Sequence, residues 1–320
     1  MDRLKKVFKR LSARLKRTVN HLKVRFEPVY KRWLAKPAVN LIVRIVNQVG
    51  NTNATALAGN VAYNVILSLF PILLGLLAIL GYFLPSATLQ SRLIQFFQAN
   101  MPGSVDILQA NFTHIINARA TLGLFGILGM LWTGISIIGT LDDAVNRAWG
   151  ITTFRPFWIA KPLELGLAIG GGLLMLISIG ASFLLSFVSR LPPPFTDFFI
   201  RTAGYILAFL LIFVILLMMY KLFPNKKTTW REVFPGAILC AVLFEIAQQL
   251  FFLYAGNLAQ YNIIYGTLAT VILFLIWIYY VAFIMIMGAI FSSELQRLRK
   301  ELHDGTYTVV KPGQQTPPRQ

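Results

Sequence analysis

The chain of 320 residues is 56% hydrophobic and only 13% charged, and it has a net charge of +18. Soluble domains usually have about 25% charged residues, so this composition argues against soluble domains and indicates one bundle of membrane-spanning helices. The single cysteine, Cys240, excludes an intrachain disulfide and a cysteine-based metal site, and its apolar neighbours predict a small buried side chain.

Residues 1–50 predict a basic amphipathic segment. The first 44 residues contain 14 lysines and arginines against Asp2 and Glu27, and apolar residues recur among them at helical spacing. This pattern is typical of a helix that lies on an anionic membrane surface. A solvated arm and a nucleic-acid-binding arm stay open as alternatives, but no aromatic platform or nucleic-acid motif accompanies the charge. We therefore expect membrane lipid, anionic lipid above all, as its partner, and no nucleic acid.

The end of this segment, residues 37–50, predicts a short helix that lies at the membrane interface. A long charged stretch precedes the first apolar run, which is unlike a cleavable signal peptide. We therefore expect the first apolar helix to stay in the protein as an anchor.

Six apolar stretches are long enough to cross a bilayer, and they predict an all-α, polytopic membrane domain over residues 51–293. The remaining residues, 294–320, are mixed in charge and end in Gly, Pro and Gln, so we expect a partly disordered tail. The predicted spans cover about residues 56–84, 120–141, 163–188, 199–223, 233–254 and 263–292.

The positive charges predict the orientation of these spans. With six spans both tails lie on the same side, and that side has 26 of the 30 lysines and arginines. The other side has only Arg92, Arg119, Arg190 and Arg201. The positive-inside rule then places both termini in the cytoplasm.

Polar residues form a stripe on the first span. Asn60, Asn64 and Ser68 recur every four residues and so share one helix face. They precede Pro71, which removes a backbone hydrogen bond and usually kinks a helix. Two interpretations stay open: hydrogen bonding to a neighbouring helix, or the lining of a cavity.

The second span ends in a run of polar residues. Asp142 and Asp143 are adjacent carboxylates, which could bind a metal or pair with arginine. Arg147 follows Asp143 by four residues, so we expect an ion pair on the helix surface and no metal. Asn146 and Trp149 complete this run.

Small residues predict close helix packing in two spans. In the second span Gly129, Thr133, Ser136 and Thr140 share a face. In the third span the small residues are glycines and serines, with the glycines at 166, 170, 171 and 172.

The fifth span contains the only carboxylate that lies well inside an apolar run, Glu245. Such a group either pairs or stays neutral, because desolvation disfavours its charged form. It is interpreted either as a proton- or substrate-coupling site in a cavity or as a satisfied hydrogen bond between helices. The residues predicted to line this cavity or bind substrate are Asn60, Tyr63, Asn64, Ser68, Glu245, Gln248, Gln249 and Tyr265.

Short motifs occur in a specific order over roughly residues 40–295. They are Ala62-Tyr63 with Ser68-Leu69-Phe70-Pro71, then Asp143-Ala144-Val145-Asn146 with Trp149-Gly150, then Pro235-Gly236-Ala237, Phe244-Glu245, Tyr254, Ile264-Tyr265-Gly266, Trp277 and Gly288-Ala289. In these motifs the chain resembles the YihY/virulence factor BrkB family. The resemblance implies a six-helix protein of the bacterial inner membrane, once filed as ribonuclease BN and usually guessed to be a transporter.

Two positions depart from that family pattern. Ala247-Gln248-Gln249 stands where the resemblance implies a lysine after the glutamate of the fifth span. Ile290 stands where it implies an acidic residue. If those charges belong to a shared mechanism, this chain lacks it or uses Glu245 differently.

The sequence offers no catalytic motif. His21, His114 and His303 are scattered, and no HExxH, Gly-x-Ser-x-Gly or Walker motif occurs. We expect no enzyme, cofactor or metal, and interpret the chain as a transporter or flippase-like protein for a lipid or other amphiphile. A membrane scaffold that recruits partners through its basic tail, and a ribonuclease, stay open as alternatives. Substrate, energy source and oligomeric state are left open by the sequence.

Overall fold

A computed structural model describes residues 34–83, 91, 105–153, 155–188, 196–258 and 262–314. These residues form helices joined by turns and irregular segments, with no strand among them. Six of the helices are long and apolar enough to cross a membrane, which confirms the all-α, six-span prediction. The helices are α2 (Pro37–Asn51), α3 (Ala54–Phe83), α5 (Val105–Ala148), α6 (Phe157–Val188), α7 (Thr196–Leu222), α8 (Trp230–Leu258) and α9 (Asn262–His303).

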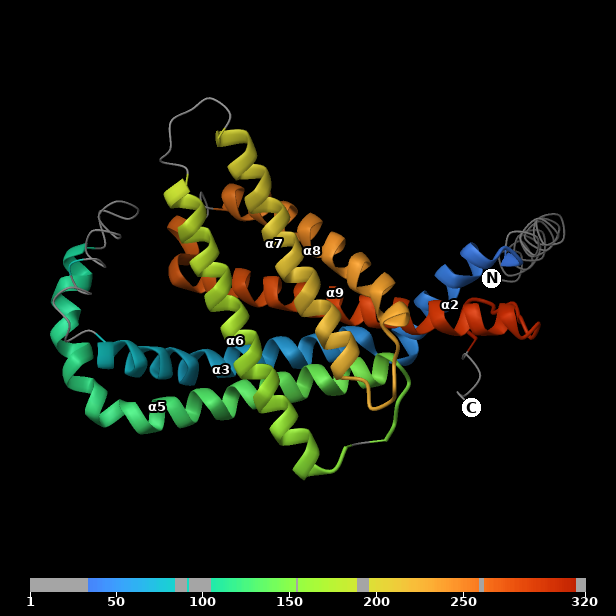
Figure 1. The fold of residues 1–320 in the computed structure, drawn as a ribbon, viewed down its shortest axis with the longest axis horizontal. Helices are drawn as coiled ribbons and strands as arrows, with labels where there is room; N and C mark the ends of the chain where they lie inside the picture. The colour runs from blue at the N-terminus through green and yellow to red at the C-terminus, as the bar shows by residue number, and fades with distance from the viewer. Residues whose placement is uncertain are drawn as a thin grey trace, which may run out of the picture.

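The six long helices contact one another in chain order (Figure 1). The strongest contact joins α3 to α5; α5 then contacts α6, α6 contacts α7, α7 contacts α8 and α8 contacts α9. The series closes because α9 packs back on α3. Consecutive apolar helices that lie antiparallel produce this order when their connections are short.

Two helices extend well beyond their predicted spans. The helix α5 has 44 residues and α9 has 42, which corresponds to about 60–66 Å at 1.5 Å per residue. The prediction ended the sixth span at residue 292, whereas α9 continues to His303. Residues 304–314 follow the helix as a described segment of turns and irregular structure. The predicted basic helix lies almost wholly in residues 1–33, outside the described part of the chain.

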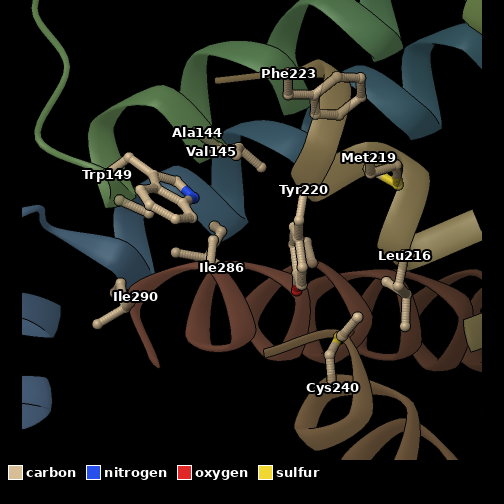
Figure 2. Close-up of a cluster of buried hydrophobic side chains, with 14 of the residues drawn as sticks. Ala144, Val145, Trp149, Leu216, Met219, Tyr220, Phe223, Cys240, Ile286 and Ile290 are labelled. Atoms are coloured by element: carbon tan, nitrogen blue, oxygen red, sulfur yellow. The ribbon is translucent and has the colours of Figure 1, made fainter. Parts of the chain in front are cut away.

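One hydrophobic core gathers at the end of the bundle that contains α2, which we call the α2 end. There the start of α3 and α8 meet the last turns of α5 and α7 and the later part of α9. Figure 2 shows Trp149, Tyr220, Phe223, Ile286 and Ile290 in this core. Cys240 is fully buried in it, as its apolar neighbours predicted.

Glycine allows α8 and α9 to cross closely. A methyl group at Gly288 would lie 2.8 Å from Cys240 Cβ and 2.9 Å from the Gly236 carbonyl oxygen, and it would also strike the Tyr220 hydroxyl. Ser292 Oγ accepts a hydrogen bond from Gly236 N at 3.1 Å and donates to Val233 O at 3.3 Å. Small residues thus bring two backbones together, as membrane helices require for strong packing.

The small-residue predictions have opposite outcomes in α5 and α6. A methyl group at Gly129 would lie 3.4 Å from Pro71 Cβ, so that face of α5 does meet α3. The prediction for the third span is wrong at its four glycines, 166, 170, 171 and 172, because no described atom of another element lies within 4 Å of a methyl group placed there. The helix α6 meets α5 instead through Glu164 and Ala168, which lie near Gly139 and Gly134.

The crossing predicts that Gly288→Ala destabilises the protein by about 1–3 kcal/mol, the usual cost of overpacking. Thermal unfolding in detergent measures this loss. Unfolding is monitored as the buried Cys240 becomes accessible and reacts with a fluorogenic maleimide. The matched control is Gly170→Ala, which meets no neighbour and improves helix propensity. Equal midpoints for Gly288→Ala and the wild type would contradict the close crossing.

Candidate functional site

The predicted polar stripe of α3 bonds to its own helix. Asn64 Nδ2 donates to Asn60 O at 3.0 Å and to Asn60 Oδ1 at 3.3 Å, and Ser68 Oγ donates to Asn64 O at 2.7 Å. Ser68 is buried, Asn64 is half-buried and Asn60 is exposed. Within the described chain none of these side chains forms a hydrogen bond to another helix, so hydrogen bonding between helices does not account for the stripe.

Tyr63 lies beside this stripe with 62% of its surface exposed. The side chain therefore lies on the outer surface of the bundle. Pro71 lies inside α3, which continues as one helix to Phe83.

Glu245 lies near the middle of α8 and is half-buried. It has no hydrogen bond or ion pair with any described residue, and neither have its neighbours Gln248 (half-buried) and Gln249 (exposed). A carboxylate of this kind is costly inside a membrane unless something pairs with it or protonates it. The interpretation of Glu245 as a satisfied bond between helices therefore finds no partner in the described structure.

The two predicted polar groups lie on different sides of α9. The helix α3 packs on α5 and α9, while α8 packs on α7 and α9. A single cavity bordered by both Asn64 and Glu245 stays a prediction. The side chain of Tyr265 lies outside the part of the structure that is described.

A second polar group lies at the α2 end, around the motif that ends α5. We call Asn146, Trp149, Arg155, Asn225 and Lys226 the α5–α7 node. Asn146 is buried; its Nδ2 donates to Phe223 O at 3.1 Å and to Asp142 O at 2.8 Å, and its Oδ1 accepts from Asn225 N at 2.7 Å. The amide thus binds a free carbonyl at the end of α7, where helices leave such groups unsatisfied.

Loop residues complete the node. Arg155 Nη2 donates to Leu222 O at 2.9 Å and to Pro224 O at 3.1 Å, and Asn225 Nδ2 donates to Thr153 O at 2.7 Å. The loop after α5 is therefore tied to the turn between α7 and α8. Sequence reasoning missed Arg155 and Asn225, because no local pattern shows that two distant loops meet.

Trp149 anchors the node in the hydrophobic core. Its side chain is fully buried, and Lys226 Nζ lies 4.5 Å from the centre of its ring, a cation–π contact (Figure 2 shows Trp149 above Ile286 and Ile290). Gly150 follows with φ of +64°, and Ile151 N donates to Asn146 O at 2.9 Å. Glycine is favoured in this left-handed end of a helix, which explains the Trp-Gly pair.

Charged side chains surround the node. Arg147 Nε donates to Asp143 Oδ2 at 2.9 Å on the exposed face of α5. Glu164 is buried against Gly139 and accepts from Lys161 Nζ at 2.8 Å. Asp142 is half-buried, and its Oδ1 has no hydrogen-bond partner. Among the described residues, no three His, Cys, Asp or Glu side chains gather as metal ligands would.

The node fastens the fold and brings no chemical group to a substrate. Its amides and guanidinium bind backbone carbonyls, and its tryptophan fills the core. Trp149 Nε1, Arg155 Nη1 and Asn225 Oδ1 of the node also lack a described partner, but they are buried at the α2 end. Glu245 and Gln248 differ because they lie inside an apolar helix. These residues are the better candidate site for a ligand.

Comparison with known proteins identifies relatives over most of the chain. Residues 45–308 match the family model described as "Virulence factor BrkB". A UPF0761 membrane protein of Alteromonas mediterranea is 30% identical over 254 residues, which cover 76% of this chain and 83% of the relative. A UPF0761 membrane protein of Pseudoalteromonas atlantica is 26% identical over 303 residues, 90% of this chain and 96% of the relative. No solved structure matches the chain.

The node predicts that Asn146→Ala lowers the thermal midpoint and the yield of monodisperse protein. The change removes a buried amide and leaves the carbonyl of Phe223 and the N–H of Asn225 without partners, at about 1–3 kcal/mol for each buried group. Arg147→Ala is the control, because its exposed ion pair contributes about 0–1 kcal/mol. Size-exclusion profiles and unfolding midpoints in detergent compare the two; equal losses would contradict the assignment.

Proposed function

Because the chain belongs to the virulence factor BrkB family of membrane proteins, we propose that it is a transporter or flippase-like protein for a lipid or other amphiphile. The proposed membrane is the bacterial inner membrane, with both termini in the cytoplasm. This orientation follows from the 26 positive charges on one side of the six spans. It makes the α2 end the cytoplasmic end.

The carboxylate of Glu245, which has no partner among the described residues, is the observation that supports transport. It lies 15 residues from the start of α8, or about 22 Å along the helix, which is close to mid-membrane depth. A carboxylate there is expensive and usually functional. We infer that its partner is a transient one: a proton, water, or the polar head of a substrate.

Access from the side also fits an amphiphile. Tyr63 and Gln249 are exposed on apolar helices that face outward from the bundle. A lipid head that crosses a bilayer needs polar side chains it can reach while its tails stay among other lipids. Polar groups on the outside of the helices meet this need better than a sealed internal channel would.

The basic segment could bring anionic lipid to the protein. Its 14 lysines and arginines attract an anionic leaflet with about 1 kcal/mol for each charge near the surface. We propose anionic lipid as the partner of residues 1–50. The same charge also suits a scaffold that recruits proteins or lipid without transporting anything, and this is the alternative that the flux experiment separates.

Proteoliposomes that contain a fluorescent phospholipid test the transport function, with dithionite used to follow its movement between leaflets. We expect flux with the wild type and a loss of about tenfold or more with Glu245→Gln, which keeps the shape and removes the charge; tenfold is about 1.4 kcal/mol of barrier. Asp304→Asn is the control, because this carboxylate is exposed and follows the last residue of α9. Wild-type protein that transports no more than empty vesicles would favour the scaffold, and capture of partners by the basic tail would support it further.

Reporter fusions test the proposed orientation. Green fluorescent protein fused at either end should fluoresce, and alkaline phosphatase fused at either end should be inactive, because both ends are expected in the cytoplasm. Phosphatase activity at only one end would mean an odd number of spans. Activity at both ends would reverse the orientation.

A further inference from the structure

The polar face of α2 points into the protein. Asn40, Arg44 and Asn47 are buried, whereas Ile42 and Val46 on the opposite face are 62% and 64% exposed. An amphipathic helix of a soluble protein would do the reverse. The buried polar face packs on the end of α9 and on residues 306–314, which we call the strap.

Arg44 joins α2 to α9 without help from the strap. Its side chain is completely buried and binds both carboxylate oxygens of Glu301, with Nη1 to Oε1 at 3.0 Å and Nη2 to Oε2 at 2.6 Å. Its Nε donates to Asn40 Oδ1 at 2.9 Å. This two-point geometry is the strongest form of the arginine–carboxylate bond. The helix α2 also packs on the core through Ile45 and Val49. The surface formed by α2 and α9 therefore does not depend on the strap.

The strap lies on this surface and is held by its backbone. Asn40 forms a pair of bonds with one residue: its Nδ2 donates to Val310 O at 3.0 Å, and its Oδ1 accepts from Val310 N at 3.4 Å. Asn47 Nδ2 donates to Lys311 O at 2.8 Å and Gln314 O at 3.1 Å, and its Oδ1 accepts from Gly313 N at 2.9 Å. Arg44 Nη2 donates to Thr308 O at 2.7 Å.

Few side chains of the strap take part. Val310 is buried, and the Tyr307 hydroxyl donates to Ala35 O at 3.3 Å. Partial burial raises the pKa of the Tyr307 phenol. Gly313 has φ of +76°, a conformation that other residues adopt at a cost. The other strap side chains are exposed. The strap is irregular over residues 306–311 and turns at residues 312–313, where Gln314 N donates to Lys311 O at 3.2 Å. It is therefore held mainly through main-chain bonds and one apolar anchor.

We propose that the polar face of α2, with the end of α9, is a binding site for a short peptide that ends in a turn, and that its resident ligand is the chain's own strap. The strap leaves and rebinds while the bundle stays folded, because the Arg44–Glu301 pair and the core contacts of α2 remain. The site recognises an apolar residue followed by glycine three positions later. When occupied, it adds the backbone bonds of the strap to Asn40, Arg44 and Asn47 of α2.

The experiment uses the full chain with Val310→Cys, in detergent or in proteoliposomes. Reaction of the introduced thiol with a maleimide reports departure of the strap, while the buried Cys240 reports unfolding of the bundle. A synthetic peptide of residues 304–314 is added in excess as competitor. The proposal expects faster labelling at position 310 with this peptide and no change with a peptide that combines Val310→Asp and Gly313→Val. The proposal would be overturned if the labelling rate at position 310 did not change with the peptide and equalled the labelling rate of Cys240.

A second variant, Asn47→Ala, tests departure of the strap without a competitor peptide. Asn47→Ala removes three bonds to the strap, so labelling at position 310 should rise about tenfold or more, with Cys240 still protected. Val46→Ala, on the exposed face of the same helix, should change neither thiol. Exposure of Cys240 together with position 310 in Asn47→Ala would show that the strap belongs to the cooperative fold, which contradicts an exchangeable ligand.

Discussion

The structure depends on how the backbone N–H and C=O groups at the ends of its helices find hydrogen-bond partners. Inside a bilayer each backbone group must find a partner within the protein, and helices meet this need everywhere except in their first and last turns. At the α2 end Asn146 and Arg155 bind the last carbonyls of α7. There Asn40 and Asn47 also bind the backbone of the strap that follows α9. The long helices are thereby fixed to one another at that end.

The contrast between this end and the apolar interior supports the functional proposal. At the α2 end, buried amides and guanidinium groups bond across elements, and glycine pairs such as Gly236 and Gly288 set the helix crossing just inside it. Along α3 the polar side chains bond back to their own helix, and Glu245 of α8 has no described partner. The bonds between elements thus gather at the α2 end, whereas Glu245 lies inside an apolar helix without a described partner.

The sequence predicted what depends on local pattern. Apolar length predicted the six spans, and the four-residue spacing predicted a pair between Asp143 and Arg147 on one helix surface. Contacts between distant loops were missed, because Arg155 and Asn225 carry no signal of each other until α5 and α7 are packed. For α2, hydrophobic pattern alone does not say which face is buried when lipid covers the outside, so the inward role of Arg44 was not anticipated. In α6 the glycines predicted a neighbour that the fold does not place there.

The distance in sequence between Arg44 and Glu301 has a consequence for biogenesis. The arginine emerges from the ribosome before the first span, and its carboxylate is made 257 residues later. Throughout insertion of the intervening helices its guanidinium must stay hydrated at the membrane surface. The contacts of α9 on α3 and α2 therefore cannot form before the last helix is made, and a chain released early would lack both.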